Sequence, residues 1–389
     1  MEQNHNILLI GANFRATFYV ARKLLEQNYI VDLIGNENIP FEKSTYINSY
    51  YYINSLQGDT FFKKELISII SEKKYEYLIP INDLGVLICK NNYHEIQKHV
   101  PIIMSNLTSQ EFAYDKYKLA LLSNNVNLGN TNSILINSQE QLLKHINTIS
   151  KFPIIAKSCN SKKVIENQVE SYCVFKALST QELISRFTNA NEFPILLQDF
   201  IQGEEYGFNF IAKNGEIQSF YFDKPYLSTF GTESIARQYV KMAPIDVEKI
   251  KMLVKMINWD GIGMFDIIVK QGKTYIIELN SRFWASIDLC EKTHSNLWYL
   301  YSQNYLMHTA NDSSNKQKEN VVLINLLSAT KTIINDIKNV NINKLDIKII
   351  LCIIKSFFSA NFFIQENILK NFRFYMYYLF VSFTKKARK

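Results

Sequence analysis

Short apolar runs alternate with amphipathic segments along the first hundred residues. Residues 6–10, 29–35 and 77–81 are apolar runs of strand length. Helices are expected between and after them, at about 16–27, 60–73 and 84–98. Strands that alternate with helices in this way are typical of a doubly wound α/β sheet. The later glycines of a dinucleotide fingerprint do not follow Gly11, so we do not expect NAD to bind here. Asp83, which follows the third strand, is expected to be the N-cap of the next helix.

A smaller α+β segment is expected next. The pattern predicts one helix over residues 109–125, with Ser109 as its N-cap and with Asp115 and Lys116 in its interior. An apolar strand over residues 152–156 then ends in Lys157. This lysine either extends from a sheet edge into solvent or faces a cleft as a phosphate ligand.

Beyond that strand the pattern predicts a loop and then further strands. Ser158–Lys163 is expected to be a polar loop, and it contains no glycine. A strand over 172–176, a helix over 180–188 and a strand over 195–201 are expected to follow it. The segment 197–210 then has a strand–turn–strand pattern in which Gly203 permits a tight turn.

The segment Gly261–Ser286 carries the strongest chemical signal. It predicts a β-hairpin with its turn at residues 271–273. Asp266 and Glu278 lie on opposite arms, so pairing of the arms brings their carboxylates together, and Asn280 points the same way as Glu278. Two carboxylates and a carboxamide form a hard-oxygen site of the kind that Mg²⁺ prefers, and Arg282 adds a planar cation suited to phosphoryl or carboxylate oxygens. An ordinary hairpin with its charges in solvent is the alternative, but Glu278 interrupts an apolar run, where a charge is costly unless it is paired.

Composition and charge change this picture little outside the C-terminal part. The chain has 389 residues, of which 47% are hydrophobic, and a net charge of +7, so we expect two to three domains with real cores. Five cysteines lie without metal-binding spacing, and neither a signal peptide nor an apolar run of membrane-spanning length is evident, so we expect a cytoplasmic protein with reduced thiols.

The basic excess lies entirely in residues 311–389, which contain 13 Lys and Arg against 5 Asp and Glu. The neutral body argues against nucleic-acid binding. Residues 321–330 are expected to form a strand or a buried helix, and helices are expected over 344–359 and 364–383. These helices either pack on the main body or lie, as a basic amphipathic element, on the inner surface of an anionic membrane.

These motifs together resemble the ATP-grasp superfamily, over most of residues 1–308. The resemblance rests on an ordered series of motifs, which are Asp115-Lys116, Lys157, Gln198 through Gly203 to Glu205, Asp266, and Glu278-Leu279-Asn280-Ser281-Arg282. It implies a Rossmann-like pre-ATP-grasp domain (1–106), a two-lobed ATP-grasp domain (107–310, with a small lobe at about 150–203) and a basic, mostly helical extension (311–389). Many relatives have a glycine-rich loop where this chain has Ser158–Lys163, which puts the lid in question.

The resemblance also implies residue roles. Lys116 and Lys157 would bind the α- and β-phosphates of ATP. Gln198 and the backbone of Phe200 and Ile201 would hold adenine, and Glu205 the ribose. Asp266, Glu278 and Asn280 would hold one or two Mg²⁺ ions, or Mn²⁺ in their place. Arg282 and Arg237 would steady the transferred phosphoryl group or the acceptor carboxylate.

The activity that the resemblance implies is ATP-dependent carboxylate–amine ligation through an acyl phosphate. The substrates would be a small-molecule carboxylate and an amine, and a homodimer is one expected state because dimers are common in the family. Two alternatives stay open. One is carboxyphosphate chemistry, as in carbamoyl-phosphate synthase or biotin carboxylase relatives, and the other is an ATP-binding module that has lost turnover.

Overall fold

The computed structural model divides into two compact units. Unit 1 comprises residues 1–104, 223–241 and 282–389, and unit 2 comprises residues 105–222 and 242–281. The structure describes residues 5–35, 39–53, 59–149, 151–160, 162–165, 168–171, 174–188, 193–228, 234–293, 295–310, 320–338, 344–359, 362–364 and 373–377. The fold class combines an N-terminal parallel sheet with antiparallel sheets and a helical C-terminal part, as the sequence predicts.

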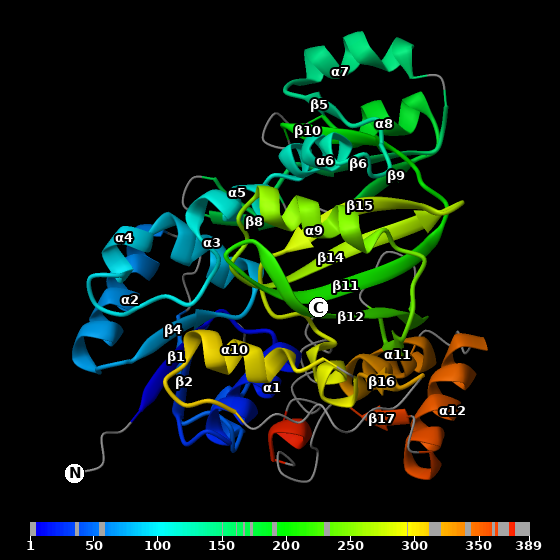
Figure 1. Cartoon of the computed structure of the whole chain (residues 1–389). Helices are drawn as coiled ribbons and strands as arrows, with labels where there is room; N and C mark the ends of the chain where they lie inside the picture. The colour runs from blue at the N-terminus through cyan, green and yellow to red at the C-terminus, as the bar shows by residue number, and fades with distance from the viewer. Residues whose placement is uncertain are drawn as a thin grey trace. The chain divides into compact units, whose positions relative to one another are not determined.

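Unit 1 begins with a four-stranded parallel sheet in the order β3-β2-β1-β4 (Figure 1). Its strands are β1 (Asn6–Ile10), β2 (Ile30–Gly35), β3 (Ser49–Tyr52) and β4 (Tyr77–Pro80). The connecting helices are α1 (Phe14–Leu25), the short 3-10 helix η1 (Phe41–Lys43), α2 (Asp59–Glu72), α3 (Asp83–Asn91) and α4 (Tyr93–Ile96). Ile7 to Ile10 are fully buried, which explains the unbroken apolar run, because helices cover both faces of a parallel sheet.

The predicted cap of α3 is wrong by one residue. The side chain of Asn82 accepts a hydrogen bond from the Gly85 amide at 2.8 Å, so Asn82 is the N-cap and Asp83 is the first helical residue. Asn82 has an extended backbone, with φ −130° and ψ 174°, as an N-cap requires. Asp83 therefore does not cap α3.

The rest of unit 1 combines a sheet with helices. The end of β12 (Glu216–Leu227) belongs to unit 1 and is followed in the sheet by β13 (Ala236–Val240), β16 (Val322–Ile324) and β17 (Phe362–Ile364). The helices are η4 (Ile287–Lys292), α10 (Leu297–Tyr305), α11 (Leu326–Lys338) and α12 (Lys344–Phe358). Apolar side chains from β13, β16, α11 and α12 form one core cluster.

The structure tests part of the secondary structure that is expected after residue 320. The segment 321–330 forms a strand first and then a helix, β16 followed by the start of α11. The helix expected over 344–359 is α12. Most of the helix expected over 364–383 lies outside the described residues. Of the described part, residues 373–377 are helical, whereas Ile364 ends strand β17. Among the helices that the structure describes, none is long and apolar enough to cross a membrane.

Unit 2 contains a small antiparallel sheet in the order β5-β10-β6-β9. Its strands are β5 (Ile134–Ile136), β6 (Ile154–Ser158), β9 (Phe175–Ala177) and β10 (Ile195–Asp199), and the helices beside it are α7 (Gln139–His145), η2 (Ile146–Thr148) and α8 (Thr180–Arg186). Leu142 of α7 and Leu183 of α8 pack with Ala156 and Ile195 in a closed apolar cluster. Figure 1 shows both helices next to this sheet, at the top of the view.

The strand expected over 172–176 is present as β9, which begins at Phe175. The polar loop expected over Ser158–Lys163 does not extend to that strand, because a hairpin forms between them. After β6, residues 162–165 and 168–171 pair as the antiparallel hairpin β7 (Lys162–Ile165) and β8 (Gln168–Ser171). Residue 161 and residues 172–173 lie outside the described part of the chain. The alternation in Lys-Val-Ile and Gln-Val-Glu favours strands, and pairing satisfies backbone groups that an open loop would expose.

The helix expected over residues 109–125 is two helices. α5 (Leu107–Tyr114) ends at Tyr114, and α6 (Lys116–Asn125) begins after an extended Asp115, with φ −103° and ψ 100°. The Asp115 carboxylate accepts hydrogen bonds from the amides of Tyr117 at 2.9 Å and Lys118 at 3.1 Å. An aspartate that caps a new helix competes with continuation of the old one. Asn106, and not Ser109, provides the side chain that caps α5.

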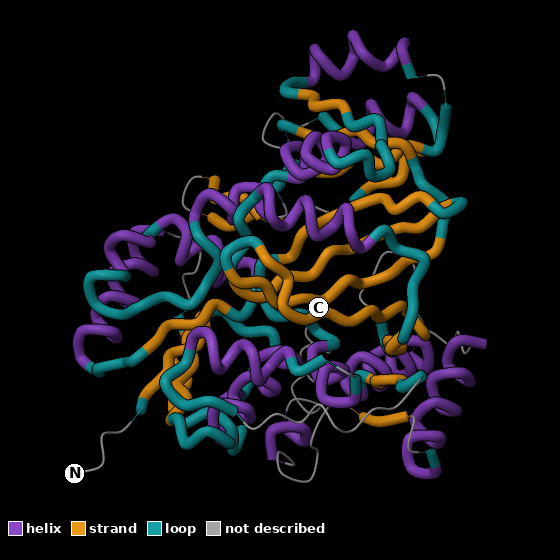
Figure 2. The backbone as a smooth tube through the Cα atoms, viewed as in Figure 1, coloured by secondary structure: helices purple, strands orange, loops and turns teal. Residues whose placement is uncertain are grey.

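The larger strands of unit 2 carry the predicted hairpin. β14 (Gly261–Lys270) pairs antiparallel with β15 (Lys273–Asn280) on one side and β11 (Glu204–Lys213) on the other (Figure 2). Gln271 and Gly272 form the turn with φ of 50° and 74°, as a two-residue hairpin turn with two left-handed residues requires. The helix α9 (Val247–Met256), capped by Asp246, precedes β14.

Candidate functional site

The two carboxylates of the hairpin lie directly opposite each other. Asp266 of β14 is the Cα partner of Glu278 of β15, and Met264 is the partner of Asn280, with a register shift just after Asp266. Residues opposite each other in a ladder, and residues two apart on a strand, share one face of the sheet. The Asn280 Nδ2 donates a hydrogen bond to the Asp266 Oδ2 at 2.9 Å. The structure therefore brings all three predicted metal ligands together on one face.

Lys116 reaches this face from the first turn of α6. Its Nζ lies 3.0 Å from the Glu278 Oε1, and its side chain is only 6% exposed. The cap by Asp115 determines where α6 begins, and the Lys116 amide donates to the Cys159 carbonyl at 3.1 Å. The helix start is thus held against the end of β6, which places the lysine next to the hairpin.

Lys157 approaches the same hairpin from β6. It lies opposite Leu196 of β10, is 4% exposed, and its Nζ donates to the Ile277 carbonyl at 3.3 Å. Burial lowers the pKa of Lys157 to about 8, and the positive charge of Lys116 acts in the same direction, against the opposing effect of Glu278 and Asp266. Two ammonium groups and two carboxylates thus interact within this part of unit 2, and an added anion would favour the charged lysines.

The donor set fits a magnesium ion that shares its coordination with phosphates. Asp266 and Glu278 supply carboxylate oxygens, and Asn280 turns its amide nitrogen to Asp266, which leaves its oxygen as a further donor. Within the described ranges, no group of three His, Cys, Asp or Glu side chains is placed to hold a metal. Mg²⁺ needs few protein ligands where substrate phosphates and water complete its octahedron, so these residues suit such an ion and not an all-protein metal site.

Gln198 is buried, and its amide is fully engaged as a donor. Its Nε2 donates to the Thr131 Oγ1 at 2.9 Å and to the Ser133 Oγ at 2.7 Å. These hydroxyls tie β10 to the segment before β5, and the sequence interpretation missed both because no motif surrounds them. Beyond β10, the Nζ of Lys176 lies 3.8 Å from the centre of the Phe200 ring. Ile201 is half-buried in the connection to β11.

Glu205 lies on the same sheet face as Asp266. Gly207 of β11 is opposite Asp266, and Glu205 is two residues before it and opposite Ile268, so strand alternation turns both the same way. Glu205 is exposed. The register thus places the predicted ribose ligand along one row with the carboxylates.

Gly203 is required for a reason other than the predicted tight turn. Its φ is not positive, but a Cβ at this position would lie 2.4 Å from the Val269 carbonyl oxygen and 2.7 Å from the Ile268 side chain. The chain passes so close to the backbone of β14 that only a hydrogen fits. This glycine therefore determines how closely the start of β11 approaches β14.

Asn209 is a polar residue on this face that the sequence interpretation did not identify. It lies opposite Met264 on β11, two residues after Gly207, and so it shares the face of Asp266. Its side chain is fully buried, and neither its Nδ2 nor its Oδ1 has a partner in the structure. Strand alternation could have assigned its face, but nothing in the sequence signals that its amide is unsatisfied.

The two predicted catalytic arginines belong to unit 1, where each binds a carboxylate. Arg282 forms a bidentate pair with Asp83, its Nε at 2.7 Å from Oδ1 and its second terminal nitrogen at 3.2 Å from Oδ2. Arg237 is likewise bidentate to Asp223, at 3.0 and 2.7 Å. Asp223 is fully buried and also accepts a hydrogen bond from Ser286 at 2.7 Å. Arg237 thus neutralises a buried charge, whereas Asp83 is 40% exposed.

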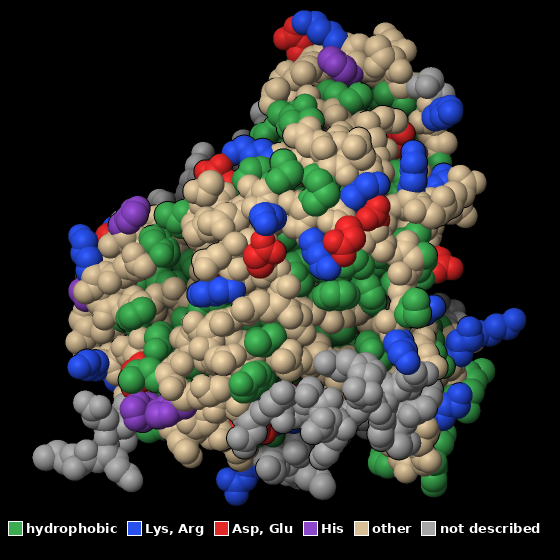
Figure 3. All heavy atoms as spheres, in the orientation of Figure 1, with side chains coloured by type: hydrophobic (Ala, Val, Ile, Leu, Met, Phe, Trp, Pro, Cys, Tyr) green, Lys and Arg blue, Asp and Glu red, His purple; other side chains and the backbone are tan. Residues whose placement is uncertain are grey.

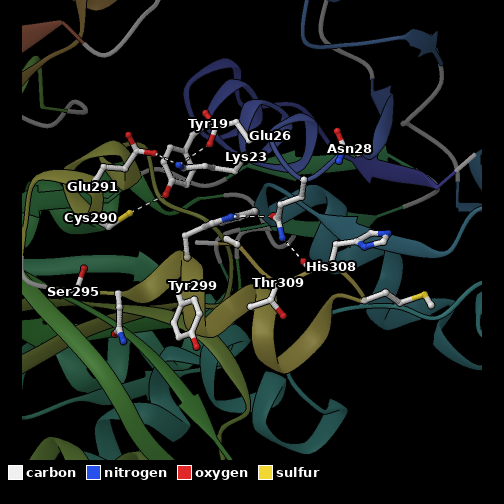
Figure 4. A pocket seen from close by; sticks show the side chains of 15 residues that line it. Tyr19, Lys23, Glu26, Asn28, Cys290, Glu291, Ser295, Tyr299, His308 and Thr309 are labelled. Atoms are coloured by element: carbon white, nitrogen blue, oxygen red, sulfur yellow. Dashed lines mark hydrogen bonds and ion pairs between the residues drawn. The ribbon is translucent and has the colours of Figure 1, made fainter. Parts of the chain in front are cut away.

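Unit 1 also contains a cavity of about 540 Å³. Figure 4 shows Lys23, Glu291, Tyr19 and Cys290 on one side of it, with His308 and Tyr299 farther along. Lys23 Nζ lies 2.7 Å from Glu291, and the Tyr19 hydroxyl lies 2.9 Å from the Cys290 sulfur. Burial raises the pKa of both Tyr19 and Cys290. None of the predicted site residues lines this cavity. Its lining comes from α1, η4, α10 and the residues next to them.

Comparison with known proteins identifies a family match for part of the chain. The ATP-grasp domain family matches residues 131–286, which include the hairpin and Gln198. No curated protein sequence matches the chain significantly.

Several solved structures share its fold. The L-amino acid ligase of Bacillus licheniformis is 14% identical, with a TM-score of 0.60 over 81% of this chain and 77% of that chain. The biotin carboxylase of Campylobacter jejuni is 13% identical, with a TM-score of 0.58 over 81% and 74%. The biotin carboxylase domain of the Hydrogenobacter thermophilus 2-oxoglutarate carboxylase, which was solved with MgADP and bicarbonate, is 15% identical, with a TM-score of 0.54 over 73% and 65%.

Identities this low show the fold alone, whereas the family match is made on the sequence of the segment that carries the hairpin and Gln198. Residues 131–286 of this chain therefore form a domain of the ATP-grasp family, and the similarity of fold agrees with this assignment.

Proposed function

We propose that this protein is an ATP-dependent carboxylate–amine ligase that forms an amide or peptide bond through an acyl phosphate. The observation that carries the proposal is the convergence of Asp266, Glu278 and Asn280 with Lys116 and Lys157 in one site of unit 2. Hard oxygen donors beside two ammonium groups suit the phosphate chain of a nucleotide with its divalent ion.

The lysines bind the α- and β-phosphates in this proposal. In the structure Lys116 is paired with Glu278, and phosphate oxygens are stronger competitors for an ammonium group because they carry more negative charge. Release of Glu278 from Lys116 frees its carboxylate to act with Asp266 and Asn280 as a ligand for Mg²⁺ or Mn²⁺. When bound, such an ion neutralises charge that develops on the transferred phosphoryl oxygens.

The nucleoside part lies along β10 and β11 in the same proposal. Gln198 and the backbone of Phe200 and Ile201 contact adenine, and Glu205, which shares the face of Asp266, holds the ribose hydroxyls. Arg282 follows Asn280 by two residues, so their Cα atoms lie no more than about 7 Å apart. It steadies the transferred phosphoryl group or the acceptor carboxylate, and it exchanges Asp83 for that partner. Arg237 assists only if it also leaves Asp223.

The reaction requires phosphorylation because a carboxylate is a poor electrophile. Its oxygen attacks the γ-phosphorus of ATP, the bond to the β-phosphate oxygen breaks, and ADP leaves with the electron pair. The amine then attacks the acyl carbon and loses a proton to solvent, and inorganic phosphate departs with the electron pair of the broken C–O bond. The contribution of this chain is orientation and fixed positive charge, which together account for most of the acceleration in phosphoryl transfer.

Carboxyphosphate formation is the second candidate, because the biotin carboxylase fold matches this chain nearly as well as the amino acid ligase fold. In that case bicarbonate would be the carboxylate that receives the phosphoryl group. The two candidates use the same nucleotide site and differ in the acceptor. An ATP-binding module without turnover is the third, and the glycine-free Ser158–Lys163 segment is the observation in its favour.

A coupled ADP-release assay over panels of carboxylates, amines and bicarbonate, with mass spectrometry of the products, tests the proposal. We expect ADP release that needs both a carboxylate and an amine and that falls at least a hundredfold in Lys116→Met. Lys118→Met is the matched control, because Lys118 lies on the same helix but pairs with the exposed Glu111. Release that depends on bicarbonate alone would favour carboxyphosphate chemistry. Nucleotide binding without release under any condition would favour the third candidate.

A second variant tests the metal assignment. Glu278→Gln keeps the size of the side chain and removes its charge, so we expect Mg²⁺-dependent ATP turnover to fall at least a hundredfold because one anionic ligand is lost. Turnover equal to that of the unmodified protein would show that Glu278 does not hold the ion.

A further inference from the structure

The helix α12 has a buried face and an exposed face, and both are apolar. Ile349 is fully buried and Cys352 is 5% exposed, and both belong to the core cluster of unit 1. Leu345 and Ile353 are partly buried against the same cluster. These residues lie on one side of the helix, and they are sufficient to anchor it to unit 1.

The opposite side of α12 exposes a stripe of large apolar side chains. Its members are Ile347 (56% exposed), Ile350 (45%), Leu351 (50%), Ile354 (47%), Phe357 (74%) and Phe358 (86%). Successive members are one or three positions apart, so they fall within about 120° of arc on a helix with 100° per residue. Scattered single apolar residues need no explanation on a surface, but a contiguous stripe of this kind marks an interaction site.

A row of lysines borders this stripe along one edge. Lys344, Lys348 and Lys355 are exposed and lie within about 40° of arc next to Leu351. The single acidic residue of the helix, Asp346, is 2% exposed and therefore belongs to the buried side. Figure 3 shows green apolar and blue basic side chains next to one another at the lower right, where Figure 1 places α12.

We propose that this face of α12 binds the surface of an anionic lipid bilayer, with the helix parallel to the membrane plane. An interfacial helix buries an apolar stripe among the acyl chains, while lysines at its edge extend to the lipid phosphates. At 15 residues, α12 is about 22 Å long and too short to span the hydrocarbon core. Its length therefore suits a position on the surface.

The charge on this face selects a bilayer over a second copy of the same chain. The exposed arc carries lysines and no exposed acidic residue, so the same face of another copy offers these lysines no opposite charge. An anionic bilayer offers both an apolar phase and negative charge, and each lysine near such a surface contributes about 1 kcal/mol. The net positive charge of residues 311–389 also favours an anionic surface as the partner of this face. This surface is separate from the nucleotide site and does not depend on its function.

Sedimentation of the full chain with vesicles tests the proposal. We expect binding to vesicles of phosphatidylcholine with 30% phosphatidylglycerol, at least tenfold weaker binding to pure phosphatidylcholine, and loss of binding at 0.5 M salt. The double variant Phe357→Ser, Phe358→Ser should weaken binding at least tenfold, and Lys344→Gln with Lys348→Gln about 25-fold, or about fivefold for each lysine. Both phenylalanines are largely exposed, so the variant should remain folded.

Met242→Ser is the matched control, because Met242 is 82% exposed and lies in unit 2. It should bind vesicles like the unmodified protein. Absence of vesicle binding by the unmodified chain, or equal binding by the phenylalanine variant and the control, would overturn the proposal. So would a dimer in light scattering that the phenylalanine variant alone converts to a monomer, because a second copy would then cover this face.

Discussion

At the scale of single residues, Lys157 shows how burial changes an ordinary side chain. An apolar strand that ends in lysine is common, and from sequence this lysine could extend into solvent. Its environment instead removes nearly all of its exposed area and places it near Lys116, Glu278 and Asp266. A cation with a lowered pKa is held in a strained electrostatic state that a phosphate would relieve.

The lowered pKa of Lys157 predicts a pH dependence of stability. Its pKa is about 8 in the folded chain and 10.5 ordinarily, so between these values the unfolded chain binds more protons than the folded one. The free energy of unfolding should therefore rise with pH across this window, by up to about 1.4 kcal/mol per pH unit from this group. Urea unfolding at pH 7.5 to 10 should show this rise in the unmodified protein relative to Lys157→Met. Parallel curves for the two proteins would contradict the assignment.

Residue identity alone did not distinguish the two predicted catalytic arginines. Arg282 and Arg237 both form two-point pairs with aspartates, but Asp223 is fully buried and Asp83 is not. The pair of Arg237 with Asp223 is therefore expected to stabilise the fold more than the pair of Arg282 with Asp83. A buried carboxylate that loses its partner is costly, because water cannot replace the lost charge.

The Arg237 pair gives a prediction that separates structure from catalysis. Arg237→Met should lower the free energy of unfolding by about 3–5 kcal/mol, because it leaves Asp223 buried and unpaired. The double variant with Asp223→Asn should recover at least half of that loss in the same urea measurement. If Arg237→Met unfolds like the unmodified protein, the pair has no structural role and the loss of activity would report on catalysis directly.

At the scale of elements, β-strand pairing assembles the site more than any helix does. The hairpin β14–β15 sets Asp266 against Glu278, and β11 adds Gly207 and Glu205 in the same register. Helix α6 contributes through one residue, Lys116, whose position depends on the cap at Asp115. A shift of one residue in any of these pairings would turn the carboxylates to the other face.

The approach of β11 to β14 depends on Gly203, which gives a prediction at this scale. Gly203→Ala places a Cβ 2.4 Å from the Val269 carbonyl oxygen, so the strands must separate locally, at a cost of about 1–3 kcal/mol. Urea unfolding measures it, and Gln202→Ala, an exposed neighbour, should change stability by less than about 0.5 kcal/mol. Equal stability of the two variants would show that the strands tolerate the added carbon without cost.

At the scale of the whole molecule, low sequence identity accompanies extensive similarity of fold. Matches at 13–15% identity extend over about three quarters or more of this chain, because packing depends on apolar patterning and volume more than on residue identity. Such a shared fold does not determine the reaction, which depends on the side chains of the site. The homodimer, the cytoplasmic location and the absence of nucleic-acid binding stay predictions.

By itself the sequence determined the local elements and the chemistry of the hairpin. Period-two and helical patterns identified the parallel sheet and α12, and the turn at Gln271-Gly272 set the register as far as the pair Ile267 and Ile276. These features follow from interactions between near neighbours, which a pattern records directly. The register shift after that pair, which opposes Asp266 and Glu278, was not evident from the sequence. The same patterns did not show the break at Asp115 or the hairpin β7–β8, because competing local bonds decided both.

Only the tertiary structure decided which distant residues meet. Lys157 contacts the Ile277 carbonyl across 120 residues, and Arg282 pairs with Asp83 across 199. Such contacts depend on how elements pack, and so do the burial that lowers the pKa of Lys157 and the close approach that requires Gly203. A linear pattern carries no information on distance between elements far apart in the chain, and the electrostatics of the site depend on that distance.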